Sequence, residues 1–455
     1  MILDESEVRV DDYQLLEGGV WKRERWWHRL TQVCQRWRNL VLQSASYLRL
    51  SLVCARGTPV SNMLANSPPF PLIIDHFDEA YRDLTTEDEE GITLALQHRD
   101  RVRRIRLMKP VPILQKLITA LDSEFPILEF LCIQNERYHR PVIEHTNLKI
   151  PEAFRAPHLR HLVIRNFAIP IGSPLLTTMR NLVTMSLNSI PPSAHFHPNA
   201  LLQRISLMPQ LETLGIMFNS YDPVRDVERH LLRTPIMTRV TLPNLRWLGF
   251  RGTSTYLEVL LPWVTIPLLE KLQVYFFNRL IYSIPHLQQF VSTAQNLRLK
   301  AARLKFHREC LLFTAYPYKG SMSITLDMTL GGRHLDWQVV SAAQVFCALR
   351  KVFSTVEHLT LEYGRYGLSS EWNNEADRTW WRELLGSFGN VKTLRVSAGL
   401  VQQISRTLQP GEGESPTELL PELQQFSYSG RSTLPNAFAL FIDVRQKAGR
   451  TITIV

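Results

Sequence analysis

The 455-residue sequence predicts an α/β fold, an irregular solenoid in which short parallel strands alternate with helices on the convex side. Two observations support this prediction: one apolar frame recurs along the chain, and amphipathic helical stripes lie between its copies. A unit of one strand and one helix cannot bury its own apolar face, so such units must stack on their neighbours. A doubly wound α/β domain also alternates strands and helices, but the sequence lacks the glycine-rich phosphate turn of that fold.

The recurring frame is x-Leu-x-x-Leu-x-apolar, often led by proline, and it is typical of a short strand that enters from a loop. Proline ends the preceding helix, the first leucine packs beneath the turn, and the last two apolar positions alternate with a polar one. The copies are PILEFLCI (126–133), PHLRHLVI (157–164), RNLVTMSL (180–187), PQLETLGI (209–216), PNLRWLGF (243–250), PLLEKLQV (267–274), STVEHLTL (354–361), GNVKTLRV (389–396), PELQQFSY (421–428) and the looser DRVRRIRL (100–107). Most copies end 23–35 residues after the one before, which leaves room for one strand, one helix and two loops.

Further elements complete the predicted alternation. The longest gap between frames fits two more strands, ARLKF (302–306) and SMSITLDMTL (321–330), the second of which alternates apolar and polar residues. Helical stripes lie at Leu114, Leu117, Ile118 and Leu121 and again at Leu201, Leu202, Ile205 and Met208. Thr86 and Glu89 have the spacing of a capping box ahead of ITLALQ.

The frame matches a leucine-rich repeat in part. Such repeats carry an asparagine three residues after the last apolar strand position, where it satisfies the turn backbone, and only Asn219 occupies that place. Because the repeat length also varies, we expect an irregular leucine-rich-repeat-like solenoid over residues 70–455.

The register of the frames predicts which side chains leave the core. If the last two apolar positions point inward, the residues between and just before them share the concave face of the sheet. The candidate substrate-binding residues on this face are Arg104, Arg106, His161, Trp247, Lys271, His358 and Arg395. Trp247, which Gly249 follows on the same face, has the character of an interface anchor. A neighbouring loop that covers Trp247 is the alternative.

The composition limits the classes of partner. A net charge of +10 and a sequence pI near 9.4 would suit a polyanion, but the charge is spread along the chain and no nucleic-acid-binding motif accompanies it. The five cysteines, at positions 34, 54, 132, 310 and 347, have no metal-binding or paired spacing. We expect them to be reduced, buried thiols of an intracellular protein, in the cytoplasm or the nucleus. No stretch has the composition of a membrane span.

No catalytic or cofactor-binding pattern emerges from the sequence. His195 and His197 lie in a proline-rich segment without a nearby cysteine or carboxylate, which indicates a solvated loop and no metal site. The run at 411–414 lacks the lysine and hydroxyl of a phosphate-binding loop. Trp380 and Trp381 are interpreted as core and lid residues. We therefore expect no enzymatic activity and no cofactor.

An amphipathic stripe near the start of the chain predicts one helix over residues 28–41, HRLTQVCQRWRNLV. Its apolar residues fall at helical spacing, and we expect them, including the tryptophan, to be buried. They are Leu30, Val33, Cys34, Trp37, Leu40 and Val41.

LTQVCQRWRNLV (30–41), followed by ASYLRLSLVC (45–54), resembles the C-terminal half of an F-box. The segments GTPVSNMLANSPPFPLII (57–74), LDWQV (335–339), FSTVEHLTLEY (353–363), EWNNEADRTWWRELL (371–385) and FGNVKTLRV (388–396) resemble the large family of F-box-like proteins in mushroom-forming fungi. The resemblance covers nearly the whole chain. The Leu-Pro helix that opens an F-box has no counterpart in residues 8–27, so that helix is degenerate or missing.

The resemblance implies a non-catalytic substrate receptor of an SCF-type cullin–RING ubiquitin ligase. The F-box would dock a Skp-family adaptor, which connects it to the cullin, and the repeats would hold a protein substrate. The adaptor-binding residues that it implies are Leu30, Val33, Cys34, Trp37 and Leu40.

The expected organisation is an N-terminal tail (1–20), an F-box-like helical module (21–56), a linker (57–69) and the solenoid (70–455). Two alternatives remain open at this point. One is a repeat-based protein-binding scaffold without ligase coupling, and the other is a nucleic-acid-binding protein that uses the basic charge.

Overall fold

The computed structural model describes residues 26–44, 48, 50–77, 84–135, 148, 150–167, 169–219, 235–276, 283–294, 299–308, 310–317, 325–331, 334–364, 377–409, 419–429 and 438–454. They belong to two compact units, Met1–Leu182 (unit 1) and Val183–Val455 (unit 2). Both units are α/β, and nearly all of their strands are parallel. In the described part of the chain, no helix has both the length and the apolar composition that crossing a membrane requires.

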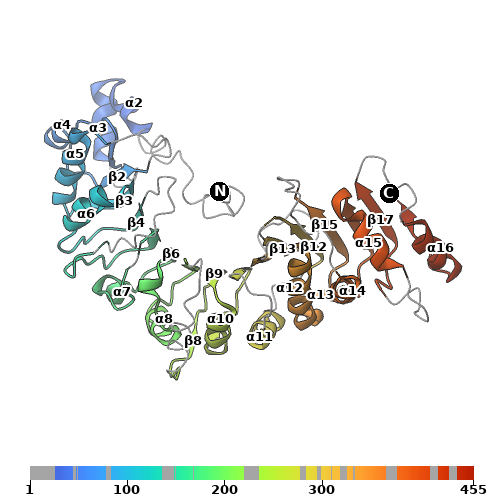
Figure 1. Ribbon diagram of the computed structural model, residues 1–455. Coiled ribbons are helices and arrows are strands. Elements are labelled where there is room, and N and C mark those ends of the chain that lie inside the picture. The colour runs from blue at the N-terminus through green and yellow to red at the C-terminus, as the bar shows by residue number, and fades with distance from the viewer. Residues whose placement is uncertain are drawn as a thin grey trace. The chain divides into compact units, whose positions relative to one another are not determined.

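The described residues of unit 1 contain a parallel sheet whose strands follow one another in chain order (Figure 1). The strands are β1 (Leu52–Ala55), β2 (Leu72–His76), β3 (Val102–Lys109), β4 (Phe130–Asn135) and β5 (His161–Arg165). The helices are α2 (Trp26–Thr31), α3 (Gln35–Gln43), α4 (Val60–Asn66), α5 (Thr86–Gln97), α6 (Val111–Thr119) and α7 (Pro174–Thr178). The expected linker at 57–69 therefore contains helix α4, and β1, from the expected N-terminal module, pairs with β2.

The described strands of unit 2 form a sheet in the order β6-β7-β9-β11-β14-β13-β12-β15-β16-β17-β18, with helices along one side (Figure 1). The strands are β6 (Thr184–Ile190), β7 (Thr213–Phe218), β9 (Trp247–Gly252), β11 (Lys271–Phe276), β12 (Ala301–Phe306), β13 (Cys310–Tyr316), β14 (Thr325–Gly331), β15 (His358–Tyr363), β16 (Thr393–Ser397), β17 (Gln425–Ser429) and β18 (Thr453–Ile454). A separate two-stranded sheet pairs β8 (Val240–Thr241) with β10 (Val264–Thr265).

The helices of unit 2 lie between these strands along the chain. They are α8 (Pro198–Ile205), α10 (Ser254–Leu260), α11 (Pro285–Thr293), α12 (Leu335–Ala348), α13 (Arg350–Phe353), α14 (Arg378–Gly386), α15 (Val401–Leu408) and α16 (Ala439–Lys447). Short 3-10 helices occupy η1 (Pro192–Ala194), η2 (Leu261–Trp263) and η3 (Ala398–Leu400). The two predicted helical stripes are confirmed, because their apolar residues are buried on α6 and α8 and in the turns that follow these helices.

Neighbouring strands pair in the register that the recurring frame predicts. In unit 1, Leu131 of β4 is the Cα partner of Ile105 on β3 and of Leu162 on β5. In unit 2, Leu248 of β9 pairs in the same way with Leu272 of β11. All five side chains are buried. Burying one aliphatic side chain contributes roughly 1.5–3 kcal/mol, so this repeated apolar row is a main source of stability in each unit.

The long gap between frames holds three strands where the sequence predicted two. Strands β12 and β14 occupy the expected segments, although residues 321–324 lie outside the described part. The unpredicted strand β13 lies between them and is antiparallel to both. An antiparallel neighbour needs only a short connection, so a strand can follow β12 without an intervening helix, and the frame carries no signal for it.

The N-terminal cap of α5 lies one residue earlier than predicted. Thr85 Oγ1 accepts the N–H of Asp88 (3.1 Å), and the Asp88 carboxylate accepts the N–H of Thr85 (3.5 Å). The sequence prediction had chosen Thr86 and Glu89, which have the same spacing. The Asp88 carboxylate also accepts the N–H of Gly57 (2.8 Å), and this contact explains why the earlier pair is the one used.

Asparagines bridge neighbouring turns in unit 1, at a spacing that the sequence analysis did not consider. Asn166 Nδ2 donates to the Asn135 carbonyl (2.9 Å), and Asn135 Nδ2 donates to the Asn166 carbonyl (3.5 Å). Each lies two residues after the last inward apolar residue of its frame, and Asn166 has a φ of 62°. In unit 2, the backbone N–H of Asn219 donates to the Ile190 carbonyl (2.7 Å).

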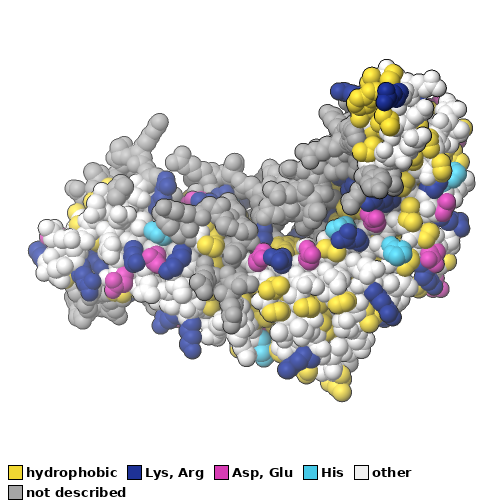
Figure 2. All heavy atoms as spheres, turned by 180° about the vertical axis from the view of Figure 1, so that it is seen from behind, with side chains coloured by type: hydrophobic (Ala, Val, Ile, Leu, Met, Phe, Trp, Pro, Cys, Tyr) yellow, Lys and Arg dark blue, Asp and Glu magenta, His cyan; other side chains and the backbone are white. Residues whose placement is uncertain are grey.

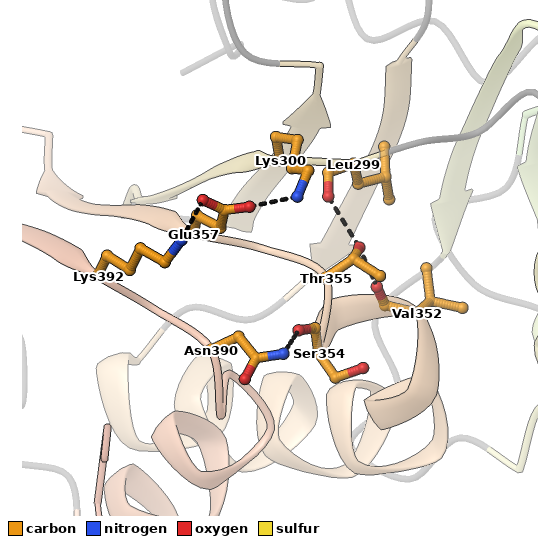
Figure 3. A network of polar contacts seen from close by, with 8 residues as sticks. All are labelled: Leu299, Lys300, Val352, Ser354, Thr355, Glu357, Asn390 and Lys392. Carbon is orange, nitrogen blue, oxygen red and sulfur yellow. Dashed lines mark hydrogen bonds and ion pairs between the residues drawn. The ribbon is translucent and has the colours of Figure 1, made fainter. Parts of the chain in front are cut away.

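Charged residues just before the strands link successive repeats. Figure 3 shows Glu357 between Lys300 and Lys392, each of which donates a hydrogen bond to its carboxylate, at 2.9 Å for Lys392. These hydrogen bonds hold the pKa of Glu357 at about 2. The backbone repeats the link, since the Glu357 N–H donates to the Lys300 carbonyl and the Glu357 carbonyl accepts the N–H of Lys392, both at 2.8 Å. Solvent-exposed ion pairs contribute little to stability, so the main effect of these pairs is on register.

Candidate functional site

The N-terminal stripe forms a pair of helices where the sequence predicted one helix. Helix α2 ends at Thr31, residues 32–33 form a turn, and α3 begins at Gln35. Cys34 is the N-cap of α3, with extended backbone angles (φ −162°, ψ 169°), and its Sγ accepts the N–H of Trp37 at 3.5 Å. A capping residue must leave the helical conformation, so the break falls at Cys34.

Three contacts hold the helix pair together and fix it to unit 1. The buried Trp27 of α2 packs edge-on against Phe70, with ring centroids 5.7 Å apart. Val41 of α3 is buried, and Arg38 Nε donates to the Thr31 carbonyl at the end of α2 (3.0 Å). The pair is therefore anchored through Trp27 and Val41, and the rest of α3 faces away from the core.

The apolar stripe of α3 lies in solvent, which corrects the expectation that it is buried. Val33, in the turn before α3, and Trp37 and Leu40 of α3 are 63%, 47% and 53% exposed. Trp37 and Leu40 lie three residues apart and therefore share one side of the helix. Leu30 is half-buried and Cys34 is exposed. Figure 2 shows hydrophobic side chains gathered at this end of unit 1, beside basic ones. Several large apolar side chains exposed together mark an interaction surface.

The surroundings of this face are basic. From residue 25 to residue 74 the chain contains six arginines and no aspartate, glutamate or lysine. Arg29, Arg36 and Arg38 are exposed on the helix pair itself. We call Val33, Trp37 and Leu40, together with these arginines, the α3 face. An apolar centre with a rim of one sign of charge favours an acidic protein partner with an apolar groove.

The other predicted binding residues lie on the outward side of each sheet, which is the side opposite the buried apolar rows. Arg104 and His161 of unit 1 both flank Phe130, with the Arg104 guanidinium 5.0 Å and the His161 ring 5.9 Å from its ring centroid. Both side chains are partly exposed. Burial lowers the pKa of His161, and Arg160 and Arg104 lower it further.

Arg106 is not a surface group, contrary to the prediction. It is 4% exposed, and its Nη1 donates to Asp75 Oδ2 at 3.1 Å. Asp75 is its Cα partner on β2 and supplies the countercharge that makes burial tolerable. The neighbouring outward side chains Phe130, Cys132 and Val163 form a small buried apolar cluster. This part of the unit 1 face is therefore packed.

In unit 2 the structure separates the candidates by exposure. Trp247 is half-buried, and its indole lies across Gly249 and Gly215. Lys271, its Cα partner on β11, is 6% exposed, so the prediction of an accessible lysine is wrong. On separate strands, His358 is partly exposed with a pKa lowered by burial, and Arg395 is exposed.

Two functional candidates on β9 and β11 escaped the sequence analysis. Arg251 and Tyr275 lie one residue beyond the last apolar position of their frames, where the frame stops. They are Cα partners, and the Arg251 guanidinium stands 4.5 Å from the Tyr275 ring centroid. Extending the strand alternation by one residue in Phe250-Arg251 and Val274-Tyr275 would have found them.

The segment at 191–197 is partly packed against the core, whereas the sequence indicated a solvated loop. Phe196 is buried against Phe218, and the half-buried His195 ring lies 4.6 Å from the same ring. Burial lowers the pKa of His195 to about 4. His197 Nδ1 accepts the N–H of Asn199 (3.0 Å) and so caps α8.

The remaining expectations concern Trp380 and Trp381, the cysteines and possible metal ligands. Trp381 is fully buried and Trp380 is half-buried. The cysteines are all free thiols, but Cys34 is exposed and Cys347 is partly exposed. The segment 411–414 lies outside the described residues. Within the described ranges, no group of three or more His, Cys, Asp or Glu side chains is arranged to hold a metal ion.

Comparison with known proteins places the chain in no family. No family model and no curated protein matches it. Among solved structures, it is similar to a chain of the yeast complex of Rad7 and Elc1, with 12% sequence identity over 92% of this chain and 86% of that chain and a TM-score of 0.31. Similarity at this TM-score supports no conclusion about fold or function.

Proposed function

We propose that this chain is a non-catalytic substrate receptor of an SCF-type cullin–RING ubiquitin ligase. In this proposal the α3 face docks a Skp-family adaptor, which joins the chain to the cullin. The strand–helix units form a leucine-rich-repeat-like solenoid whose outward strand face holds a protein substrate. The chain contributes proximity and no chemical step of its own.

The observation that carries the proposal is an exposed apolar group, formed by two residues of α3 and one residue of the turn before it. Val33, Trp37 and Leu40 cannot contribute to the core of unit 1, yet the pair of helices that presents them is fixed by Trp27 and Arg38. A rigid, exposed apolar helix face loses little entropy on docking. The resemblance of residues 30–54 to the second half of an F-box supports an adaptor as the partner.

The anchoring also suggests how the face can act without the Leu-Pro helix of an F-box. In the described residues, α2 takes a supporting position beside α3, with Trp27 packed against Phe70 and the Thr31 carbonyl bound by Arg38. The adaptor would then contact α3 and the turn at Val33. This contact area is small, so we expect binding to be weaker than for an interface of standard size.

Co-purification with a Skp-family adaptor tests the proposal. Leu40→Asp places a charge in the α3 face and should abolish co-purification. Leu440→Asp is the matched control, because Leu440 on α16 has nearly the same exposure, 54% against 53%, but lies in unit 2. Both variants should keep the circular dichroism and unfolding midpoint of the wild type.

Two results would overturn the assignment. One is a folded wild-type chain that retains no adaptor, and the other is equal loss of adaptor with Leu40→Asp and Leu440→Asp. In the first case, a scaffold that binds proteins without ligase coupling becomes the better account.

A further inference from the structure

Trp247 and Arg251 form two anchors on one strand of unit 2. Both belong to β9 and, four residues apart, leave the strand on its outward face, with Cα atoms about 13 Å from each other. A β-carbon added at Gly249 would lie 2.4 Å from the indole Cη2, and one at Gly215 would lie 3.1 Å from Cζ3. The indole therefore rests on two glycine backbones, and its half-buried state leaves part of the ring accessible.

Arg251, four residues after Trp247 on β9, presents a charged guanidinium group. Its guanidinium is stacked on Tyr275, and its Nε is buried without a hydrogen-bond partner. In the described part of the chain, we find no carboxylate paired with Arg251. Arginine stays protonated at all ordinary pH values, and its planar donors match a carboxylate or a phosphate. Stacking restricts the side chain beforehand, so little entropy is lost when an anion binds.

The surrounding charge favours an anionic occupant. The outward positions of the described strands of unit 2 contain five cations and two anions. These are Arg251, Lys271, Arg303, Lys305 and Arg395 against Asp327 and Glu362. Glu362 pairs with Arg303 at 3.4 Å, so these two charges offset each other and the remaining cations still outnumber the remaining anion.

We infer that β9 recognises an extended peptide that places an aromatic side chain on Trp247 and, four residues away, a carboxylate or phosphate on Arg251. Residues i and i+4 of an extended chain point to the same side and span the same distance as the two anchors. This inference rests on the proposed function, because it names the substrate class of the outward face. It assigns Trp247 to stacking and Arg251 to charge pairing.

A single-stranded nucleic acid fits the same face less well. Such a ligand needs successive stacking platforms and a cation near each phosphate along its path. Between the two anchors the strand offers only Gly249, which the indole covers, and the next outward residues along that row are Gln273 and Asp327. The path therefore lacks a cation and passes beside a carboxylate.

Fluorescence anisotropy with designed peptides tests the inference. The probes are fluorescein-labelled Gly/Ser decapeptides with Phe at one position and Glu, phosphoserine or Lys four residues later. A fourth peptide has Glu three residues after Phe, which points it to the opposite side of an extended chain. We expect the Glu or the phosphoserine peptide to bind, and the Lys and three-residue peptides to bind at least about tenfold more weakly. Comparing Glu with phosphoserine identifies the source of the anion.

Variants of the full-length chain locate the site. Trp247→Ala and Arg251→Gln should each weaken binding of the preferred peptide by about tenfold or more. Arg450→Gln is the control, because Arg450 is an exposed arginine of unit 2 that lies between α16 and β18, outside the outward strand positions, and it should change the dissociation constant by less than about twofold. Arg251→Glu should transfer the preference to the Lys peptide.

Several outcomes would overturn the inference. They are no binding of any peptide at millimolar concentration, equal effects of Arg251→Gln and Arg450→Gln, and tighter, Trp247-dependent binding of a fluorescein-labelled oligouridylate decamer. The same preparations are tested for adaptor binding. A chain that binds the adaptor but no peptide leaves the proposed function standing without this substrate class, whereas a chain that binds peptide but no adaptor loses only the ligase coupling.

Discussion

Asp75 and Arg106 form a buried ion pair across β2 and β3, with Nη1 and Oδ2 3.1 Å apart and side chains only 6% and 5% exposed. The Arg106 guanidinium also lies 4.9 Å from the Phe77 ring centroid. The pair occupies the outward face of unit 1, where the sequence pattern had placed a substrate-binding arginine. A carboxylate, a ring and burial together turn that position into part of the structure.

Breaking this pair should destabilise the protein strongly. Arg106→Met leaves Asp75 charged and buried, and we expect the free energy of unfolding to fall by about 3–5 kcal/mol. The double variant Asp75→Leu/Arg106→Met removes both charges and should recover most of the loss. Urea unfolding of the two variants checks this expectation. Equal stability of the single variant and the wild type would contradict it.

Trp247 and Gly249 should be coupled. A methyl group at position 249 would collide with the indole, so Gly249→Ala must displace the ring or strain the strand, at a cost of about 1–3 kcal/mol. In a Trp247→Ala background the obstacle is absent, and Gly249→Ala should cost almost nothing. A double-mutant cycle by chemical unfolding measures the difference, and additive effects would mean that the indole does not rest on Gly249.

Acid should destabilise the fold through two neutral histidines. Burial lowers the pKa values of His76 and His195 from 6.5 to about 4. Below pH 6.5 the unfolded chain binds protons that the folded chain accepts only near pH 4, so stability is complete above pH 6.5 and falls between these values. For His76, which is 3% exposed, the full loss is about 3 kcal/mol.

Unfolding midpoints at pH 7.5, 6.0 and 5.0 measure this dependence. His76→Gln removes the titrating group and should flatten the profile relative to the wild type, even if it lowers stability at pH 7.5. A wild-type midpoint that does not change between pH 7.5 and 5.0 would be inconsistent with neutral, buried histidines.

Arg445 should be essential for the C-terminal end of unit 2. It is fully buried, and its guanidinium donates to the carbonyls of Leu419, Leu420 and Pro421 at 3.2, 3.1 and 3.0 Å. A lysine cannot reproduce this fork, so Arg445→Lys should cost about 2 kcal/mol or more, as unfolding by urea would reveal. Arg450→Lys, at an exposed arginine, is the control and should change stability by less than about 0.5 kcal/mol.

The repeated strand frame was predictable because apolar alternation is local. The inward residues of β3 to β5, and of most strands of unit 2, follow directly from the Leu-x-x-Leu-x-apolar spacing. Strand β13 was missed because it contains no copy of the frame, and its antiparallel pairing with β12 and β14 is visible only in the structure. The capping box was misplaced for a similar reason, since the Gly57 contact that favours Asp88 is 31 residues away.

Exposure of the site residues was much harder to predict than their placement. Periodicity identified Trp37 and Leu40 as apolar and on one helix face, but it could not tell a core from a docking surface, because both have the same pattern. Arg106 and Lys271 were correctly placed on outward strand positions, yet both are buried, and Arg106 is paired there with Asp75 on the neighbouring strand. Such pairings become visible only when the strands are aligned in space.

The most direct test of the proposed function is the affinity of the full chain for a purified, fluorescently labelled Skp-family adaptor. We expect a measurable dissociation constant that Trp37→Ala raises by about tenfold or more, because Trp37 is central to the α3 face. Trp337→Ala is the control, since Trp337 is 44% exposed against 47% for Trp37 but belongs to unit 2, and it should leave the affinity unchanged. No binding by the folded wild-type chain, or equal losses for the two tryptophan variants, would contradict the account.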